Sequence, residues 1–224
     1  MPLLKICGIT REEDARWCES SGVWALGFIL VSGSPRYCPP EKAAGIIRQL
    51  RGKALAVGVF QDETAANVND ITRRCGFDLV QLHGEEAPEE CRAVEVPVIK
   101  AFSVDEGWVP ASLASYIGSI AMVLLDARRG TQRGGTGWPF PWEVLPLLAD
   151  LSLPLIIAGG LGEENIPDLL SRCSPWAIDC NSRVETAPGC KDRRTIRRIL
   201  NRLSQYRKEV NSAHLTHQTL KERT

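Results

Sequence analysis

Residues 154–182 read PLIIAGGLGEENIPDLLSRCSPWAIDCNS, and this stretch contains one complete strand–helix–strand unit. An apolar run at 154–159 ends in glycine, a helix-length segment follows over roughly 163–172, and a second apolar run starts at residue 176. Buried parallel strands have such continuous Val, Ile and Leu runs, and the helix between two of them returns the chain to the start of the next strand. The stretch therefore predicts a parallel sheet covered by helices.

The same pattern repeats along the whole chain. Apolar runs rich in Val, Ile and Leu occur eight times, at residues 3–9, 24–30, 54–60, 79–83, 97–102, 121–127, 154–159 and 176–180. Helical segments fit after each run, at roughly 12–21, 40–51, 63–75, 87–93, 110–117, 142–150, 163–172 and 192–208. Eight βα units in 224 residues predict an α/β fold of the (β/α)8, or TIM, barrel type. A doubly wound open sheet is the alternative, but no G-x-G-x-x-G string follows the first run.

The domain organisation follows from the absence of linkers in the sequence. No Gly/Ser-rich segment or change in composition divides residues 1–210, which we expect to form a single (β/α)8 barrel domain. Residues 211–224 (NSAHLTHQTLKERT) are polar and have no periodic apolar face, so they predict a frayed or disordered C-terminal tail.

The last helical segment, 192–208, has the clearest periodicity. Ile196, Ile199, Leu200 and Leu203 follow the i, i+3, i+4, i+7 spacing of one buried stripe. Five arginines cover the rest of its surface, at positions 193, 194, 197, 198 and 202. The buried stripe favours a solvated outer face over a nucleic-acid patch.

Composition limits the classes of function. The 27 Lys and Arg residues balance 27 Asp and Glu residues, so the chain has no global positive field to hold a nucleic acid. The eight cysteines form no C-x-x-C pair, which indicates a reducing compartment rather than a disulfide framework or a zinc site. Charged residues come early in the chain, and residues 107–125, though uncharged, are broken by proline and serine. We expect a soluble, cytoplasmic protein with neither a secretory signal nor a membrane span.

Two residues at strand ends can carry acid–base chemistry, because a barrel places its active site at the carboxyl ends of its strands. Cys7 ends the first run and shares a strand face with Lys5, whose ammonium would favour the thiolate. Asp126 ends the sixth run, where a carboxylate must find a partner or accept a proton more readily, as a general acid does. A small core thiol and a loop ion pair are the structural alternatives.

Other residues at the same end can bind anions. Arg36, in a loop fixed by glycine and proline, can meet a carboxylate with two hydrogen bonds, although a solvated arginine is as good an interpretation. His83 ends the fourth run and is given no chemical step. After the seventh and eighth runs, Gly159, Gly160, Ser182 and Arg183 mark turns whose backbone amides can hold a phosphate. The glycine-rich loop 134–137 could close over a substrate.

Taken together and in order, these strings resemble the phosphoribosylanthranilate isomerase family of tryptophan biosynthesis. The matching strings are KICGIT (5–10), GFIL (27–30) with SGSPR (32–36), VGVF (57–60), QLHGEE (81–86), LLDA (124–127) with GGTGWPFPW (134–142), IIAGGL (156–161) and VETAPGCKD (184–192). They extend over nearly the whole predicted barrel.

The resemblance implies an Amadori rearrangement of N-(5-phosphoribosyl)anthranilate to 1-(2-carboxyphenylamino)-1-deoxyribulose 5-phosphate. It implies that Cys7 is the general base, that Asp126 is the general acid and that Arg36 holds the anthranilate carboxylate. Neither a metal nor an organic cofactor is required, because the iminium formed on ring opening acidifies the adjacent C–H bond. The expected partner is a phosphosugar substrate rather than a nucleic acid or a membrane, and the chain is expected to be a monomer or a homodimer.

One departure from the family pattern concerns the phosphate turn. The family usually has a glycine where this chain has Arg183, so the arginine points outward, adds a contact to the phosphate, or damages the site. Two alternative functions remain at this point. One is a related phosphosugar barrel isomerase with another aminoaldose phosphate as substrate, and the other is a non-catalytic phosphoribosyl-binding barrel.

Overall fold

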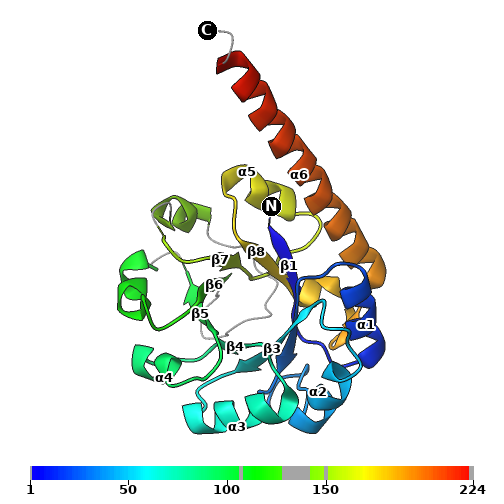
Figure 1. The fold of residues 1–224 in the computed structure, drawn as a ribbon, viewed down its shortest axis with the longest axis vertical. Coiled ribbons are helices and arrows are strands. Elements are labelled where there is room, and N and C mark those ends of the chain that lie inside the picture. Colours follow the sequence, from blue (N-terminus) through cyan, green and yellow to red (C-terminus); the bar gives the residue numbers. More distant parts are fainter. Residues whose placement is uncertain (1, 106–107, 128–141, 149–150, 222–224) are drawn as a thin grey trace.

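A computed structural model describes residues 2–105, 108–127, 142–148 and 151–221. Eight parallel strands close into a barrel in the order β1 to β8, as the sequence predicts, with the helical segments arranged around them (Figure 1). The strands are β1 (Leu3–Ile6), β2 (Ala25–Ile29), β3 (Leu55–Phe60), β4 (Leu79–Leu82), β5 (Val98–Val104), β6 (Met122–Ala127), β7 (Leu155–Ile157) and β8 (Ala177–Cys180).

Helical segments follow the strands at the predicted places. The α-helices are α1 (Glu12–Ser20), α2 (Pro40–Ile47), α3 (Ala65–Cys75), α4 (Pro88–Arg92), α5 (Ile166–Arg172) and α6 (Arg193–Lys221), and the 3₁₀ segments are η1 (Pro110–Tyr116), η2 (Trp142–Leu148) and η3 (Ser182–Val184). Where α-helices were expected, η1 begins at a proline and η2 contains Pro146. Pro146 lies inside η2 and has no N–H for the α-helical ladder, which favours the short 3₁₀ form. Pro110 at the start of η1 does not explain the 3₁₀ form there, since α2 and α4 also begin at proline.

One element follows β8 without any signal in the predicted pattern. After η3 the chain forms an antiparallel hairpin of β9 (Glu185–Ala187) and β10 (Cys190–Lys191). The side-chain hydroxyl of Thr10, in the loop after β1, donates to the carbonyl of Gly189 in the hairpin turn at 2.7 Å. The hairpin is thereby held beside the carboxyl end of β1.

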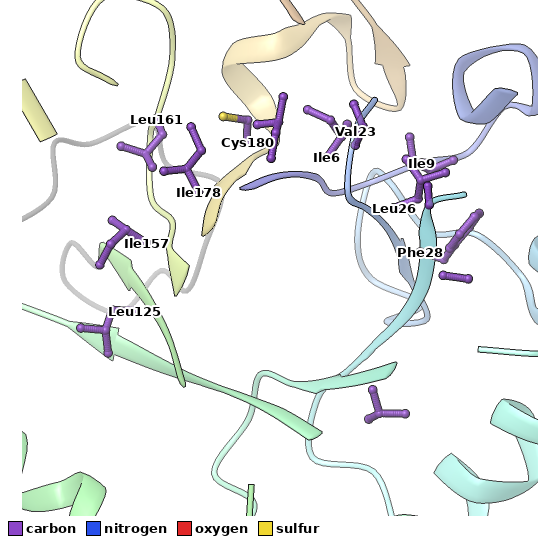
Figure 2. Close-up of a cluster of buried hydrophobic side chains, with 14 of the residues drawn as sticks. Ile6, Ile9, Val23, Leu26, Phe28, Leu125, Ile157, Leu161, Ile178 and Cys180 are labelled. Carbon is purple, nitrogen blue, oxygen red and sulfur yellow. The ribbon is translucent and has the colours of Figure 1, made fainter. Parts of the chain in front are cut away.

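Alternation along the strands separates two apolar layers. Residues facing the barrel interior, such as Ala25, Val57, Ile99, Leu124 and Ile156, form a small inner cluster. Their neighbours face the helices and form the larger outer cluster, part of which Figure 2 shows, including Ile6, Phe28, Leu125, Ile157 and Ile178. Because the period of a strand is two, each inward position is followed two residues later by another. Beyond the residues of the inner cluster, the next inward-facing position on each strand lies at the mouth of the barrel.

The last helix confirms the predicted buried stripe. Ile196, Ile199 and Leu203 are almost fully buried, and Leu200 packs against the same core. The guanidinium groups of Arg193 and Arg197 lie over the ring of Trp17, at 6.0 and 5.6 Å from its centroid. Arginines on this helix thus also contact neighbouring helices. In the described part of the chain, no helix has the length and apolarity to cross a membrane.

The sequence predicts a frayed or disordered tail over residues 211–224. In the structure, α6 continues into this segment and ends at Lys221. Figure 1 shows the end of α6 projecting away from the barrel, with the C-terminus at its tip.

We expect deletion of residues 211–224 to leave the melting temperature and the turnover of the protein unchanged, because this part of α6 projects beyond the barrel. Thermal unfolding and steady-state turnover of the shortened chain, beside the full chain, measure this. A large loss of either would show that the end of α6 stabilises the barrel or completes its assembly.

Candidate active site

A cavity of about 350 Å³ opens at the carboxyl ends of the barrel strands. Every strand end except that of β5 contributes to its wall. The lining residues are Cys7, Ile29, Val31, Gly33, Ser34, Pro35, Arg36, Gln61, Gln81, His83, Asp126, Ala158, Gly159, Gly160, Leu161, Asp179, Asn181 and Ser182. The cavity therefore brings together seven residues that the sequence singled out for chemistry or binding, namely Cys7, Arg36, His83, Asp126, Gly159, Gly160 and Ser182, but not Arg183.

Strand alternation explains why polar side chains meet there. On β6, Asp126 follows the inward-facing Leu124 by two residues, and on β8, Asp179 follows the inward-facing Ala177. The inner layer is thus apolar at the bottom of the barrel and polar at its mouth. The alternation of side chains along a strand is enough to explain why Asp126 and Asp179 point into the barrel.

Cys7 is almost fully buried beside the ammonium of Lys5. Burial raises the pKa of the Cys7 thiol above its ordinary value, and the nearby positive charge of Lys5 offsets this only in part. The predicted neighbour is therefore present and favours the thiolate, as expected, but the pKa of Cys7 is still raised overall because burial is the larger contribution. Gly27 makes room for the pair, since a Cβ at this position would lie 2.8 Å from Cys7 Sγ and 3.1 Å from Lys5 Nζ.

Lys5 itself forms a buried salt bridge to Asp179, with 2.8 Å between Nζ and Oδ2. Burial is the largest single influence and opposes the charge of Lys5, but the charges and hydrogen bonds of Asp179 and Cys7 together outweigh it, so the pKa of Lys5 lies above its ordinary value. Burial also raises the pKa of Asp179, and Lys5 offsets this only partly while the charge of Asp126 adds to it. Two carboxyl groups from different strands therefore influence one another across the cavity.

Asp126 lies close to His83, with 3.4 Å between Asp126 Oδ2 and His83 Nε2. The other ring nitrogen of His83, Nδ1, is 3.1 Å from Nε2 of Gln81. Asp126 is almost entirely buried, and the histidine is about four-fifths buried. A chain of polar groups thus leads from Gln81 on β4 to Asp126 on β6.

Three buried polar atoms of the cavity have no hydrogen-bond partner within the described part of the chain. They are His83 Nε2, Gln81 Oε1 and Asp179 Oδ1. Buried polar groups in proteins are almost always satisfied, so unpaired groups that line one cavity indicate a place for a polar ligand. The hydroxyl groups of a sugar would satisfy them.

Arg36 reaches the cavity from the loop after β2, where its backbone N–H donates to Ser34 Oγ at 3.1 Å. Its guanidinium is 13% exposed and pairs with Glu185 of β9, with 2.8 Å between Arg36 Nη2 and Glu185 Oε2. The predicted arginine is therefore held in the wall of the cavity rather than solvated.

The turn after β7 is built from Gly159 and Gly160, which both have positive φ, 88° and 62°. Asn165 fixes this turn, because its Oδ1 accepts from the N–H of Gly162 and its Nδ2 donates to the carbonyl of Gly160, both at 2.9 Å. A Cβ at Gly159 would lie 2.3 Å from the backbone nitrogen of Ala127, beside Asp126. Only glycine fits there without displacing the end of β6.

Gly159→Ala is expected to lower the free energy of unfolding by about 2–5 kcal/mol, from positive-φ strain together with the clash against Ala127. Gly22→Ala is the matched control, because Gly22 also has positive φ, 87°, but a Cβ there would meet nothing within 4 Å. The control should cost only about 1 kcal/mol. Urea unfolding of both variants measures the difference, and equal losses would show that the contact with Ala127 is unimportant.

Ser182 lines the cavity at the start of η3, whereas Arg183 does not. The Arg183 side chain forms an ion pair with Glu164, in the loop after β7, and a Cβ at Gly162 would lie 3.0 Å from Arg183 Cδ. Among the described residues, Asp62 is the only one other than glycine with positive φ, so Arg183 itself is not strained. Of the three outcomes considered for this position, the observed contacts match the outward-pointing one.

The predicted lid at 134–137 lies outside the described residues. Sequence reasoning missed four residues in or beside the cavity: Gln81, Asp179, Asn165 and Glu185. Strand parity with His83 and Asn181 could have revealed Gln81 and Asp179. Within the described residues, no group of three or more His, Cys, Asp and Glu side chains is arranged to hold a metal ion.

Comparisons with known proteins show which family this chain resembles. A family model described as N-(5'-phosphoribosyl)anthranilate (PRA) isomerase matches residues 4–202. A Syntrophus aciditrophicus protein named N-(5'-phosphoribosyl)anthranilate isomerase is 44% identical over 92% of this chain and 89% of its own length.

Solved structures show the same architecture. The phosphoribosyl anthranilate isomerase of Thermus thermophilus superposes with a TM-score of 0.83 at 38% identity, over 91% of this chain and 98% of that chain. Another phosphoribosyl anthranilate isomerase, solved with reduced 1-(o-carboxyphenylamino)-1-deoxyribulose 5-phosphate, superposes at 0.77 and 33% identity over 89% and 97%.

Proposed function

The chain belongs to the N-(5'-phosphoribosyl)anthranilate isomerase family and is an isomerase of tryptophan biosynthesis, and we propose that Cys7 and Asp126 carry out the proton transfers of its reaction. The single observation that carries this assignment is that Cys7, directly after β1, and Asp126, in β6, line one cavity together with three buried polar atoms that have no hydrogen-bond partner among the described residues. A sugar placed in this cavity can be reached by both groups.

Asp126 is the general acid. It donates a proton to the ring oxygen of the ribose, so the bond from that oxygen to C1 breaks and the ring opens to an iminium. His83, 3.4 Å from Asp126 Oδ2, restricts the carboxyl group and is also placed to contact the substrate. Loss of the proton leaves a carboxylate in a site that already contains the Lys5 ammonium.

Cys7 is the general base. The iminium acidifies the adjacent C2–H bond, and the thiolate takes that proton while the electron pair forms the C1–C2 double bond and the iminium pair moves onto nitrogen. The resulting enaminol then tautomerises: C1 gains a proton, the C2 hydroxyl loses one, and the C2 carbonyl of the ketose forms. The Lys5 ammonium beside the sulfur stabilises the thiolate form.

Binding is assigned to the two sides of the cavity. Arg36 holds the anthranilate carboxylate through paired hydrogen bonds. On the other side, the turn at Gly159 and Gly160 and the turn at Ser182 hold the phosphate through backbone amides. Arg183 lies outside the cavity, where its ion pair with Glu164 joins the turn after β8 to the loop after β7.

Turnover of phosphoribosylanthranilate, generated in place from anthranilate and phosphoribosyl pyrophosphate, tests this function, because the fluorescence of the anthranilate group reports loss of substrate. The native chain is expected to turn it over. Binding of the reduced product analogue without turnover would instead support a non-catalytic phosphoribosyl-binding barrel. Turnover of another aminoaldose phosphate alone would support a related isomerase.

The ionisation of Cys7 is expected to follow its burial. Because burial raises the pKa of Cys7 above its ordinary value, the ligand-free protein holds a thiol at neutral pH, and the reactive thiolate increases as the pH rises. The rate of alkylation by iodoacetamide, located at Cys7 by mass spectrometry, should therefore still be rising at pH 9. A rate that levels off below pH 8 would contradict this and show that Lys5 dominates.

The setting of the enzyme follows from the same function. We infer a cytoplasmic enzyme that acts on a small phosphosugar and has no nucleic-acid partner, in keeping with the balanced charge of the chain. The assembly state remains a prediction of monomer or homodimer, which sedimentation velocity would distinguish.

A further inference from the structure

A buried cluster of charges lies behind one wall of the cavity. Glu185 is 3% exposed and Lys191 is fully buried, and their side chains meet with 2.7 Å between Oε1 and Nζ. Glu185 also accepts from Arg36, at 2.9 Å from Nε to Oε2 and 2.8 Å from Nη2 to Oε2. Two cations therefore share one carboxylate, and the cluster has a net charge of one positive unit.

The fold assembles this cluster from three separate segments. Arg36 comes from the loop after β2, while Glu185 and Lys191 come from the two strands of the β9–β10 hairpin. Gly8 allows the segments to approach, because it has positive φ and a Cβ there would lie 2.8 Å from Arg36 Cδ and 2.7 Å from Asn181 Oδ1. Lys191 Nζ also donates to that same Asn181 oxygen at 3.2 Å, which links the cluster to the turn after β8.

Glu185 stays ionised in this place. Burial works against its charge, but the hydrogen bonds from Arg36 and the charge of Lys191 outweigh burial and hold the pKa of Glu185 below its ordinary value. The N–H of Gly189 in the hairpin turn also donates to Glu185 Oε1, at 3.1 Å. The carboxylate is therefore fixed on several sides, and it offers Arg36 a rigid acceptor.

The planar shape of the Arg36 guanidinium decides whether it can bind a second anion while it contacts Glu185. Glu185 accepts from the Nε and Nη2 side of Arg36, so the end of the fork formed by Nη1 and the second Nη2 proton is not used by this contact. A planar guanidinium can bind two carboxylates at once through these two edges. Arg36 lines the cavity, so its second edge is available to an anionic ligand there.

We propose that Glu185 is a positioning residue that orients Arg36 toward the carboxylate of the substrate ring, with Lys191 as the cation that balances Glu185. This inference rests on the proposed role of Arg36 as the group that binds that carboxylate. For the affinity of an anionic ligand, it also makes a prediction opposite to the one that net charge alone would make. A negative Glu185 repels an anionic ligand, so removing its charge should tighten binding if only net charge mattered, but it should weaken binding if orientation matters more.

The test measures two ligands on three variants by titration calorimetry. The ligands are the reduced product analogue, which carries the ring carboxylate, and its counterpart with an unsubstituted phenyl ring. Glu185→Gln is expected to weaken the affinity for the carboxylate ligand about tenfold or more, because it removes the charged acceptor that holds Arg36. The affinity for the phenyl ligand is expected to change by less than about threefold. Equal weakening of both ligands, or tighter binding of the carboxylate ligand, would overturn the proposal.

Two further variants separate the possible failures. Arg36→Met should lose the same selectivity; if it weakens both ligands equally, the assigned role of Arg36 itself is wrong. If Arg36→Met is selective and Glu185→Gln is not, only the positioning role fails. Glu19→Gln is the matched control, because Glu19 is also a buried carboxylate but accepts from the backbone of Arg51 and Lys53 away from the cavity, and it should change neither affinity.

If Glu185→Gln does not fold, Glu185→Asp makes the same test. Aspartate keeps the charge but is shorter by one methylene group, so it cannot hold the Arg36 fork in the same place. The same selective loss for the carboxylate ligand is expected. Unchanged affinity for both ligands in Glu185→Asp would overturn the proposal.

Discussion

Replacing Asp126 by asparagine is expected to lower kcat about 10²–10⁴-fold, the range that one positioned proton transfer contributes. Asparagine keeps the size of the side chain and its place beside His83, but it has no proton of suitable acidity for the ring oxygen. Because Asp126 is almost entirely buried at the end of β6, bulk water has little access to replace it. Ring opening should become rate-limiting in this variant.

Asp78→Asn is the matched control for this prediction. Asp78 precedes β4, at the opposite end of the barrel from the cavity, and its Oδ2 accepts from the N–H of Ala56 at 2.7 Å. The control should turn over substrate at nearly the native rate. If Asp126→Asn keeps more than a tenth of native kcat, another group supplies the proton, and His83 would be the first candidate.

Replacing Cys7 by alanine is expected to lower kcat by a similar factor, about 10²–10⁴-fold, because the base that takes the C2 proton is lost. Serine at this position should be nearly as inactive, since a hydroxyl group gives up its proton far less readily than a thiol and so supplies almost none of the anion that acts as the base. The steady-state turnover of both variants measures this, with the reduced product analogue as a check that the cavity still binds.

Cys18→Ala is the control for removing a buried thiol. Cys18 is fully buried in α1 and is not among the residues that line the cavity, so it takes no part in the chemistry. This variant should keep native kcat even if it is somewhat less stable. Full activity of Cys7→Ala, or a loss of activity in Cys18→Ala equal to that in Cys7→Ala, would remove the basis for assigning Cys7 as the base.

The fold follows closely from the sequence because strand and helix periodicities are local. Each predicted run contains most or all of the corresponding strand, and the direction of Lys5 and Cys7 into the barrel follows from their spacing of two residues. Local sequence predicted α-helices at 110–117 and 142–150, but the structure has 3₁₀ segments there, and only in the second does a proline inside the helix, Pro146, remove an α-helical hydrogen bond. The extension of α6 to Lys221 was not predicted because it has no periodic apolar face to reveal it.

The site was predictable only where one residue could be recognised alone. Cys7 and Asp126 stand at strand ends, but that His83 lies 3.4 Å from Asp126 depends on how the barrel closes. The pairing of Arg36 with Glu185 joins residues 149 positions apart, and no periodicity relates them. The direction in which the pKa of Cys7 is shifted could be found only from the structure. The sequence shows the nearby lysine but not the burial, and burial outweighs the effect of the lysine.

The central claim is that Cys7 and Asp126 perform chemistry rather than hold the barrel or the ligand. Turnover and the affinity for reduced 1-(o-carboxyphenylamino)-1-deoxyribulose 5-phosphate, measured on the same preparations of Cys7→Ala and Asp126→Asn, test it most directly. We expect kcat to fall by about 10²-fold or more in each variant while the affinity changes by less than about tenfold. Native turnover in either variant, or a loss of affinity as large as the loss of kcat, would contradict the claim.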